Sequence, residues 1–179
     1  MLPNPLHPAV VHFPVVLALL LPFFAAGALW AIRRGTTPRR AWAIPVALAL
    51  ALALSAWVAV QTGEAQDERV ERVVAEQPLE AHEEAAELFL TLSGGLALLV
   101  AAGLVRGRVG RLSRGLATAG AVALVVVAAQ VGHSGGQLVY RYGAASAYTG
   151  GQGAGTRAEM SAAGEPGASA ATVRRVRDD

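Results

Sequence analysis

Cysteine and lysine are absent from this 179-residue chain, and charged residues of either sign are scarce. Without cysteine there are no disulfides, no thiolate metal sites, no iron–sulfur clusters and no covalent c-type haem, so a bound metal or haem needs other ligands. Only 16% of the residues are charged and 54% are hydrophobic, whereas soluble domains average about 25% and roughly 45 to 50%. This imbalance excludes an ordinary soluble domain and indicates a protein that lies in lipid.

Four long apolar runs hold most of the hydrophobic residues. A helix needs about 20 apolar residues to cross about 30 Å of hydrocarbon. The runs predict transmembrane helices over about residues 12–32, 42–63, 84–105 and 116–140. The first run is too long for the apolar region of a signal peptide, which has about 7 to 15 residues, so we expect it to be retained. The sequence predicts an all-α integral membrane protein, with a four-transmembrane-helix bundle over residues 1–142.

The arginines define an orientation for this bundle. Two clusters, Arg33 to Arg40 and Arg106 to Arg114, lie between the first two runs and between the last two. Arginine-rich loops stay on the cytoplasmic side of a membrane. Residues 64–87 carry nine acids and two arginines, so we expect this segment to face outward. Both termini are then predicted outside, and no nucleic-acid partner is needed to explain the arginines.

Two segments outside the runs also carry predictions. Pro78 is expected to separate the second helix from a third helix that opens near Glu80, because proline interrupts a helix. From Gly143 onward the chain is rich in Gly, Ala and Ser and has no apolar run that could form a core. This composition predicts a disordered extracytoplasmic tail over residues 143–179.

All four histidines lie on the outer side of the predicted topology. His7 and His12 open the first helix, His82 opens the third, and His133 lies in the outer part of the fourth. Imidazole is a common ligand of Zn, Cu and haem iron, and an unpaired ionisable residue is costly at membrane depth. A shared metal or haem site is therefore predicted at the outer end, with Glu64 beside it.

The fourth helix places His133 in a polar stripe. Gln130, His133 and Gln137 recur at intervals of three and four, so they share a helix face that can turn toward the bundle. The alternative for every histidine is an ordinary solvated or hydrogen-bonded residue near the interface. Glu64 is, on the same reasoning, an acid at a helix end, and the acidic segment is a solvated surface.

Four segments carry a family resemblance. They are H-P-A-V-V-H-F-P from His7 to Pro14, T-G-E at 62–64, His82, and G-G-Q-L-V-Y-R-Y-G from Gly135 to Gly143. Together they resemble DUF2231, an uncharacterised bacterial membrane family, over about residues 5–145. The resemblance implies a four-helix domain of the bacterial cytoplasmic (inner) membrane and supplies no activity. His7, His12, Glu64 and His82 match the family pattern, whereas many relatives lack a histidine at the position of His133.

Three functions are consistent with these residues. The first is a redox protein that binds b-type haem through two of His12, His82 and His133 and exchanges electrons with a partner on the outer face. The layout is similar to di-haem cytochrome b bundles, but histidines on one side only allow at most one haem.

The second function is binding or transport of divalent Zn or Cu by a mixed nitrogen and oxygen site. Its predicted ligands are His7, His12, Glu64 and His82. The third is a non-catalytic accessory subunit of a membrane complex, docked through the acidic segment or the tail. No catalytic residue is assigned, because no Ser-His-Asp arrangement, H-E-x-x-H helix or carboxylate pair stands out.

Overall fold

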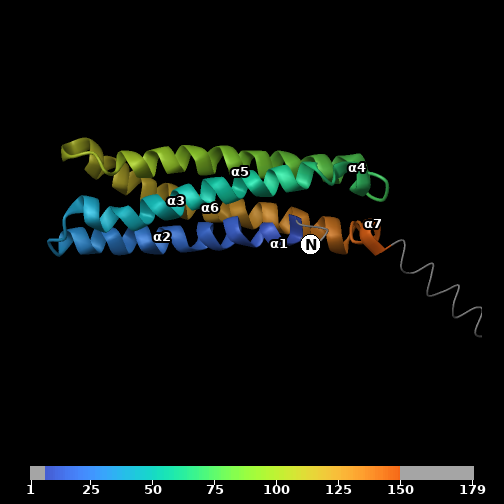
Figure 1. Cartoon of the computed structure of the whole chain (residues 1–179), viewed down its shortest axis with the longest axis horizontal. Helices are drawn as coiled ribbons and strands as arrows, with labels where there is room; N and C mark the ends of the chain where they lie inside the picture. The colour runs from blue at the N-terminus through green and yellow to red at the C-terminus, as the bar shows by residue number, and fades with distance from the viewer. Residues whose placement is uncertain (1–6, 150–179) are drawn as a thin grey trace, which may run out of the picture.

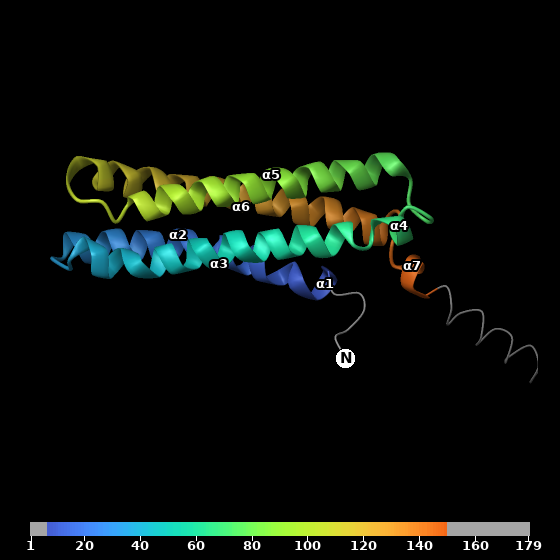
Figure 2. The same ribbon diagram turned by 45° about the horizontal axis from the view of Figure 1, so that its top comes forward.

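The computed structural model describes residues 7–149, and every regular element in that range is a helix. The four long helices pack side by side as an antiparallel bundle (Figure 1, Figure 2). Each of them contacts two neighbours, in the cyclic order α2, α3, α5, α6. The elements are α1 (His7–Val10), α2 (His12–Arg33), α3 (Pro38–Glu64), α4 (Asp67–Val70), α5 (Glu76–Ala102), α6 (Gly107–Tyr140) and α7 (Ser146–Thr149).

The outer surface of the bundle is apolar. All four long helices are long and apolar enough to cross a membrane, and at most 28% of each one's apolar window is buried. Phe23 and Leu98, for example, are 74% and 76% exposed. A continuous apolar surface of this kind is favourable in lipid and costly in water. The prediction of a four-helix membrane protein is confirmed, and the bilayer is the solvent of its outer surface.

Small side chains fill the interior between the helices. On α2 and α6 the buried positions recur every three or four residues, as expected for one face of a helix. Alanine at these positions lets neighbouring backbones approach closely, which is the main source of helix packing in lipid. The buried set on these two helices includes Ala18, Leu21, Ala25 and Ala28, and Ala117, Ala121, Leu124 and Ala128.

The two ends of the bundle differ in composition. We call the end with the connections at residues 34–37 and 103–106 the arginine end, and the end with residues 65–75 the histidine end. At the arginine end α2 closes with a Schellman turn, in which Gly35 has a φ of 99° and Thr36 N–H donates to the Ala31 carbonyl at 3.0 Å. Pro38 then opens α3, where its missing amide hydrogen costs nothing.

The helices α3, α5 and α6 begin earlier than the predicted spans, whereas α5 ends at Ala102 and not at residue 105. α5 begins at Glu76, so Pro78 lies in its first turn, where a backbone N–H has no partner within the helix. The prediction that Pro78 separates two helices is therefore wrong, and residues 65–75 with α4 make the separation. α6 has 34 residues, or about 51 Å at about 1.5 Å per residue, so it extends beyond the hydrocarbon layer.

The structure describes the chain as far as Thr149, beyond Gly143, where the disordered tail was predicted to begin. The short helix α7 lies against the histidine end, where the Tyr148 hydroxyl donates to the Gln66 side chain and Arg69 stacks on the Tyr148 ring at 5.7 Å. Ala144 is buried with Val74, Leu79 and Leu138 in a small second core. Residues 150–179 of the predicted tail lie outside the described residues.

Candidate functional site

His7 enters the bundle at the histidine end and is half-buried. Its Nδ1 lies 2.9 Å from the Ala59 carbonyl oxygen of α3 and 3.4 Å from Thr62 Oγ1. The ring also rests on Gly63, where an added Cβ would lie 3.2 Å from His7 Cε1. The Thr62-Gly63 pair thus forms a seat on α3 that holds one edge of the imidazole.

His82 is held in the same way by a different pair of helices. It lies on α5, is half-buried, and its Nδ1 is 2.8 Å from Ser134 Oγ of α6. Its ring rests on Gly135, where an added Cβ would lie 3.1 Å from His82 Cε1. A serine and the following glycine on α6 therefore match the threonine and glycine on α3.

These contacts assign the proton on each neutral ring. The Ser134 hydroxyl donates to the Val131 carbonyl at 3.0 Å, so its oxygen accepts from His82 Nδ1–H. His7 Nδ1 faces a carbonyl oxygen, which only accepts, so it is also the protonated nitrogen. In both rings Nε2 then carries the lone pair, and neither Nε2 has a hydrogen-bond partner among residues 7–149.

The two imidazoles lie within electrostatic range of each other, and Asp67 lies within range of His7. The pKa of the Asp67 carboxyl is raised by burial, and further by the negative charges of Glu64 and Glu71. Between residues 7 and 149, no three His, Asp or Glu side chains are already grouped closely enough to hold a metal ion. His7 therefore has one carboxyl group, that of Asp67, within electrostatic range, and His82 has the His7 imidazole.

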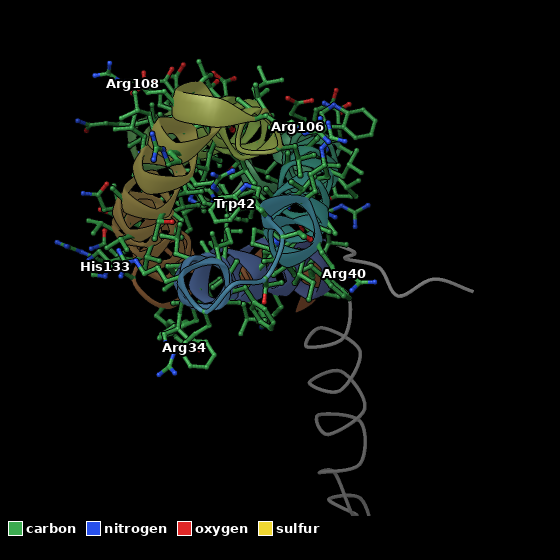
Figure 3. The ribbon with its side chains drawn as sticks, turned by 90° about the vertical axis from the view of Figure 1, so that its left-hand side faces the viewer. Arg34, Arg40, Trp42, Arg106, Arg108 and His133 are labelled. Carbon is green, nitrogen blue, oxygen red and sulfur yellow. The ribbon has the colours of Figure 1, made fainter. Side chains whose placement is uncertain are left out.

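The other predicted ligands do not join this pair. His12 is exposed, one residue beyond the break between α1 and α2. His133 is exposed and points away from the bundle, where the Gln137 amide donates to its Nε2 at 2.9 Å (Figure 3). Glu64 is exposed and accepts from Gln61 at 2.8 Å. Of the five predicted ligands, His7 and His82 are the two histidines that are half-buried at this end, and they lie within electrostatic range of each other.

The comparison with protein families matches the same segments. The DUF2231 family, described as a predicted membrane protein, matches residues 3–147. The chain belongs to this family. Its match spans all four long helices, both histidine seats and the start of α7. No curated protein and no solved structure matches this DUF2231 protein.

Sequence reasoning chose His133 and missed its neighbour Ser134, which holds His82. In this DUF2231 protein, the spacing of the buried residues along α6 indicates which side of the helix faces the bundle, and this pattern points to Ser134. The buried residues of α6 include Ala117, Ala121, Leu124, Ala128 and Leu138, and continuing that spacing between 128 and 138 arrives near Ser134, with His133 rotated about 100° away. The expectation that the stripe of Gln130, His133 and Gln137 turns toward the bundle is wrong, because Gln130 and His133 are exposed.

The arginine end holds a second polar cluster that the sequence did not reveal. Trp42 is fully buried, at 0% exposure, and its indole N–H donates to the Val100 carbonyl at 2.8 Å (Figure 3). Arg114 is 5% exposed, and its guanidinium donates to the Gly103 carbonyl at the end of α5. Arg114 was predicted as one of the loop arginines, but the structure buries it against the end of α5.

Proposed function

We propose that this DUF2231 protein binds a divalent transition metal ion, such as Zn²⁺ or Cu²⁺, at the histidine end. The single observation that carries the proposal is the shared geometry of His7 and His82, which direct Nδ1–H into the protein and keep Nε2 as a lone pair. Metal-binding histidines commonly donate the other ring N–H to a carbonyl or side-chain oxygen, which fixes the tautomer and the ring orientation.

The surroundings of the pair favour a cation. Imidazole suits Zn and Cu, and the rest of the coordination would come from water or from a neighbouring carboxylate such as Asp67. The acids of residues 64–87 attract cations to this end. The seats on Gly63 and Gly135 support a defined ring position, because any larger residue there would meet the imidazole.

The haem alternative has less support from the geometry. Two of its three predicted ligands, His12 and His133, are exposed on the outside of the bundle. A reduced-minus-oxidised visible spectrum of the purified protein after haem-supplemented expression tests this alternative directly. A Soret band that disappears in His12→Ala or His133→Ala would favour haem and overturn the assignment of His7 and His82 as the ligand pair.

The metal proposal is tested by titrating detergent-purified full-length protein with Zn²⁺ in a calorimeter. We expect His7→Ala and His82→Ala each to weaken binding at least tenfold, because each removes a ligand. His12→Ala and His133→Ala are matched controls and should bind like the unchanged protein. Equal binding by all four variants, or no binding by the unchanged protein, would overturn the proposal and leave the accessory-subunit prediction ahead.

We further propose that the histidine end faces outward from the bacterial inner membrane. The support is the separation of charge, because the acids within residues 7–149 lie between Glu64 and Glu87 and the arginine clusters lie at the opposite end. The absence of cysteine makes a clean test available. A membrane-impermeant maleimide should label Glu68→Cys and spare Arg108→Cys in intact spheroplasts, and the reverse labelling would invert the orientation.

A further inference from the structure

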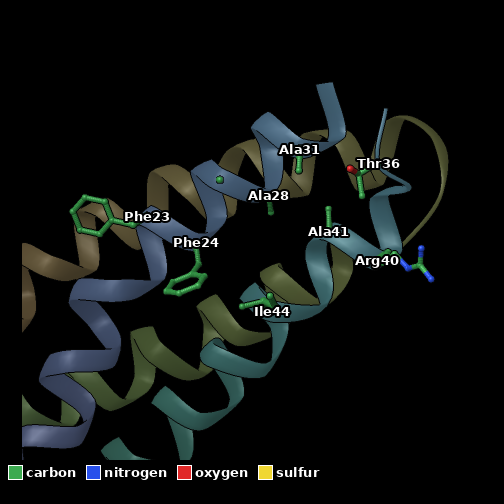
Figure 4. A pocket seen from close by; sticks show the side chains of 9 residues that line it. Phe23, Phe24, Ala28, Ala31, Thr36, Arg40, Ala41 and Ile44 are labelled. Atoms are coloured by element: carbon green, nitrogen blue, oxygen red, sulfur yellow. The ribbon is translucent and has the colours of Figure 1, made fainter. Parts of the chain in front are cut away.

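A groove opens on the outer surface between α2 and α3 at the arginine end. Its volume is about 380 Å³, near the lower limit of the roughly 300–1,000 Å³ typical of small-molecule sites. Figure 4 shows Phe24 and Ile44 facing each other across it, and Ala31 and Ala41 facing each other nearer the loop. Thr36 and Arg40 lie at its mouth.

Gly27 leaves part of the α2 wall of the groove without a side chain. A Cβ built on Gly27 meets no atom within 4 Å, so the space beside this residue is open. The part of α2 that lines the groove runs from Phe23 to Ala31, which is about 12 Å of helix at about 1.5 Å per residue. That length fits within half of a hydrocarbon layer about 30 Å thick, so the groove lies in one leaflet.

The mouth of the groove is positively charged. Arg40 lies in the first turn of α3, and all the acids of residues 7–149 lie between Glu64 and Glu87, at the other end. The neighbouring Arg34 is stacked on Trp30 at 5.3 Å. Thr36 and Arg40 are the lining residues whose side chains carry hydrogen-bond donors. Figure 4 shows the Arg40 guanidinium at the loop end of the groove, directed away from Phe24 and Ile44, where a polar headgroup can reach it.

We infer that the groove binds one phospholipid with an anionic headgroup. One acyl chain lies against Phe24, Gly27 and Ile44, and the phosphate accepts hydrogen bonds from Arg40 and Thr36. Basic pockets between transmembrane helices are suited to anionic headgroups. A zwitterionic lipid would bring its own ammonium group toward Arg33, Arg34 and Arg39, so charge complementarity favours the anionic lipid.

Native mass spectrometry of the full chain in mild detergent tests the inference, with phosphatidylglycerol and phosphatidylcholine as the two probes. The unchanged protein should retain one phosphatidylglycerol in preference to phosphatidylcholine. Arg40→Gln should reduce that preference by roughly fivefold, the effect expected of one arginine near a lipid headgroup. Arg108→Gln is the matched control, because Arg108 is an exposed arginine in the first turn of α6, at the same end of the bundle.

Gly27→Leu tests the apolar part separately. The added side chain enters open space, and leucine favours a helix more than glycine, so the protein should fold and lose the retained lipid. Equal retention of the two lipids, or an equal effect of Arg40→Gln and Arg108→Gln, would overturn the inference. Loss of a dimer in Gly27→Leu with unchanged lipid retention would also overturn it, by making the groove a contact between two copies of the chain.

Discussion

The arginine end and the histidine end of the bundle both bury polar side chains, but they leave those side chains in different states. At the arginine end, the Trp42 indole and the Arg114 guanidinium both donate to carbonyls near the C-terminus of α5. The partial negative charge of a helix C-terminus favours a cation there. At the histidine end, the contacts hold Nδ1 of each imidazole and leave Nε2 available. At the arginine end both polar side chains donate hydrogen bonds within the protein, whereas at the histidine end each imidazole keeps one ring nitrogen without a partner among residues 7–149.

The largest effect is expected from removing the buried cation of the arginine end. Arg114→Ala should lower the free energy of unfolding by about 3 kcal/mol, through a lost charged hydrogen bond and a new cavity. Circular dichroism during denaturation in detergent measures it. Arg111→Ala is the control, because Arg111 is exposed on the same helix. Similar values for the two variants would show that burial of Arg114 is not stabilising.

A smaller effect is expected at the histidine end, on ligand binding rather than on folding. Ser134→Ala removes the oxygen that accepts from His82 Nδ1, which frees the tautomer and the ring orientation. Loss of such a supporting contact typically lowers metal affinity by about 10–100-fold. Zn²⁺ titration should show this loss with little change in the denaturation midpoint. A large loss of stability with unchanged affinity would make this end structural, like the other.

Substitutions at Gly135 and Gly136 test whether the position of the His82 ring matters for binding. Gly135→Ala places a methyl group 3.1 Å from His82 Cε1, whereas Gly136→Ala meets no atom within 4 Å. Both changes favour the helix by similar amounts, so the difference between them isolates the contact with the ring. We expect Gly135→Ala to reduce Zn²⁺ affinity several-fold and Gly136→Ala to leave it unchanged. Identical affinities would mean that the ring position does not matter.

The smallest effect concerns the acids beside the imidazole pair. Burial and the charges of Glu64 and Glu71 raise the pKa of Asp67 above 3.8. The folded state therefore holds this proton more tightly than the unfolded state, so stability falls as pH rises from the ordinary value through the raised one.

Asp67→Asn should flatten that dependence and stabilise the metal-free protein at pH 7 by less than about 0.5 kcal/mol. Denaturation in a chelator across pH 3 to 7 measures the effect, with the exposed Glu68→Gln as control. An unchanged pH dependence in Asp67→Asn would show that another group is responsible.

The sequence predicted the number of helices because four apolar runs separated by charged segments have few other structures in a membrane. It placed His7 and His82 at one end because alternating loops fix which residues share a side. The rotation of each helix was harder to predict. Lipid-facing and core-facing positions are both apolar, so hydrophobic periodicity does not separate them as it does in water. This is why His133 was preferred to Ser134.

The contacts that close the end of α5 could not be predicted from the sequence either. The cluster from Arg106 to Arg114 was predicted as loop charge, and nothing in its composition distinguishes the buried Arg114 from the exposed Arg111. The distinction depends on the close packing at Gly103, where an added Cβ would overlap the Trp42 indole nitrogen. Trp42 is far from Gly103 and Arg114 in the sequence, and a local pattern does not show that it meets them.

The Trp42 contact has a consequence for assembly of the bundle. Its indole lies in the hairpin of α2 and α3, and the carbonyl that accepts its hydrogen bond lies in the later hairpin of α5 and α6. Before the two hairpins pack together, the Val100 carbonyl does not lie beside Trp42, so the indole N–H needs a different hydrogen-bond acceptor. Docking of the second hairpin replaces that partner with Val100. In the assembled bundle the Trp42 indole N–H is hydrogen-bonded to the other hairpin, and this hydrogen bond opposes separation of the two hairpins in lipid.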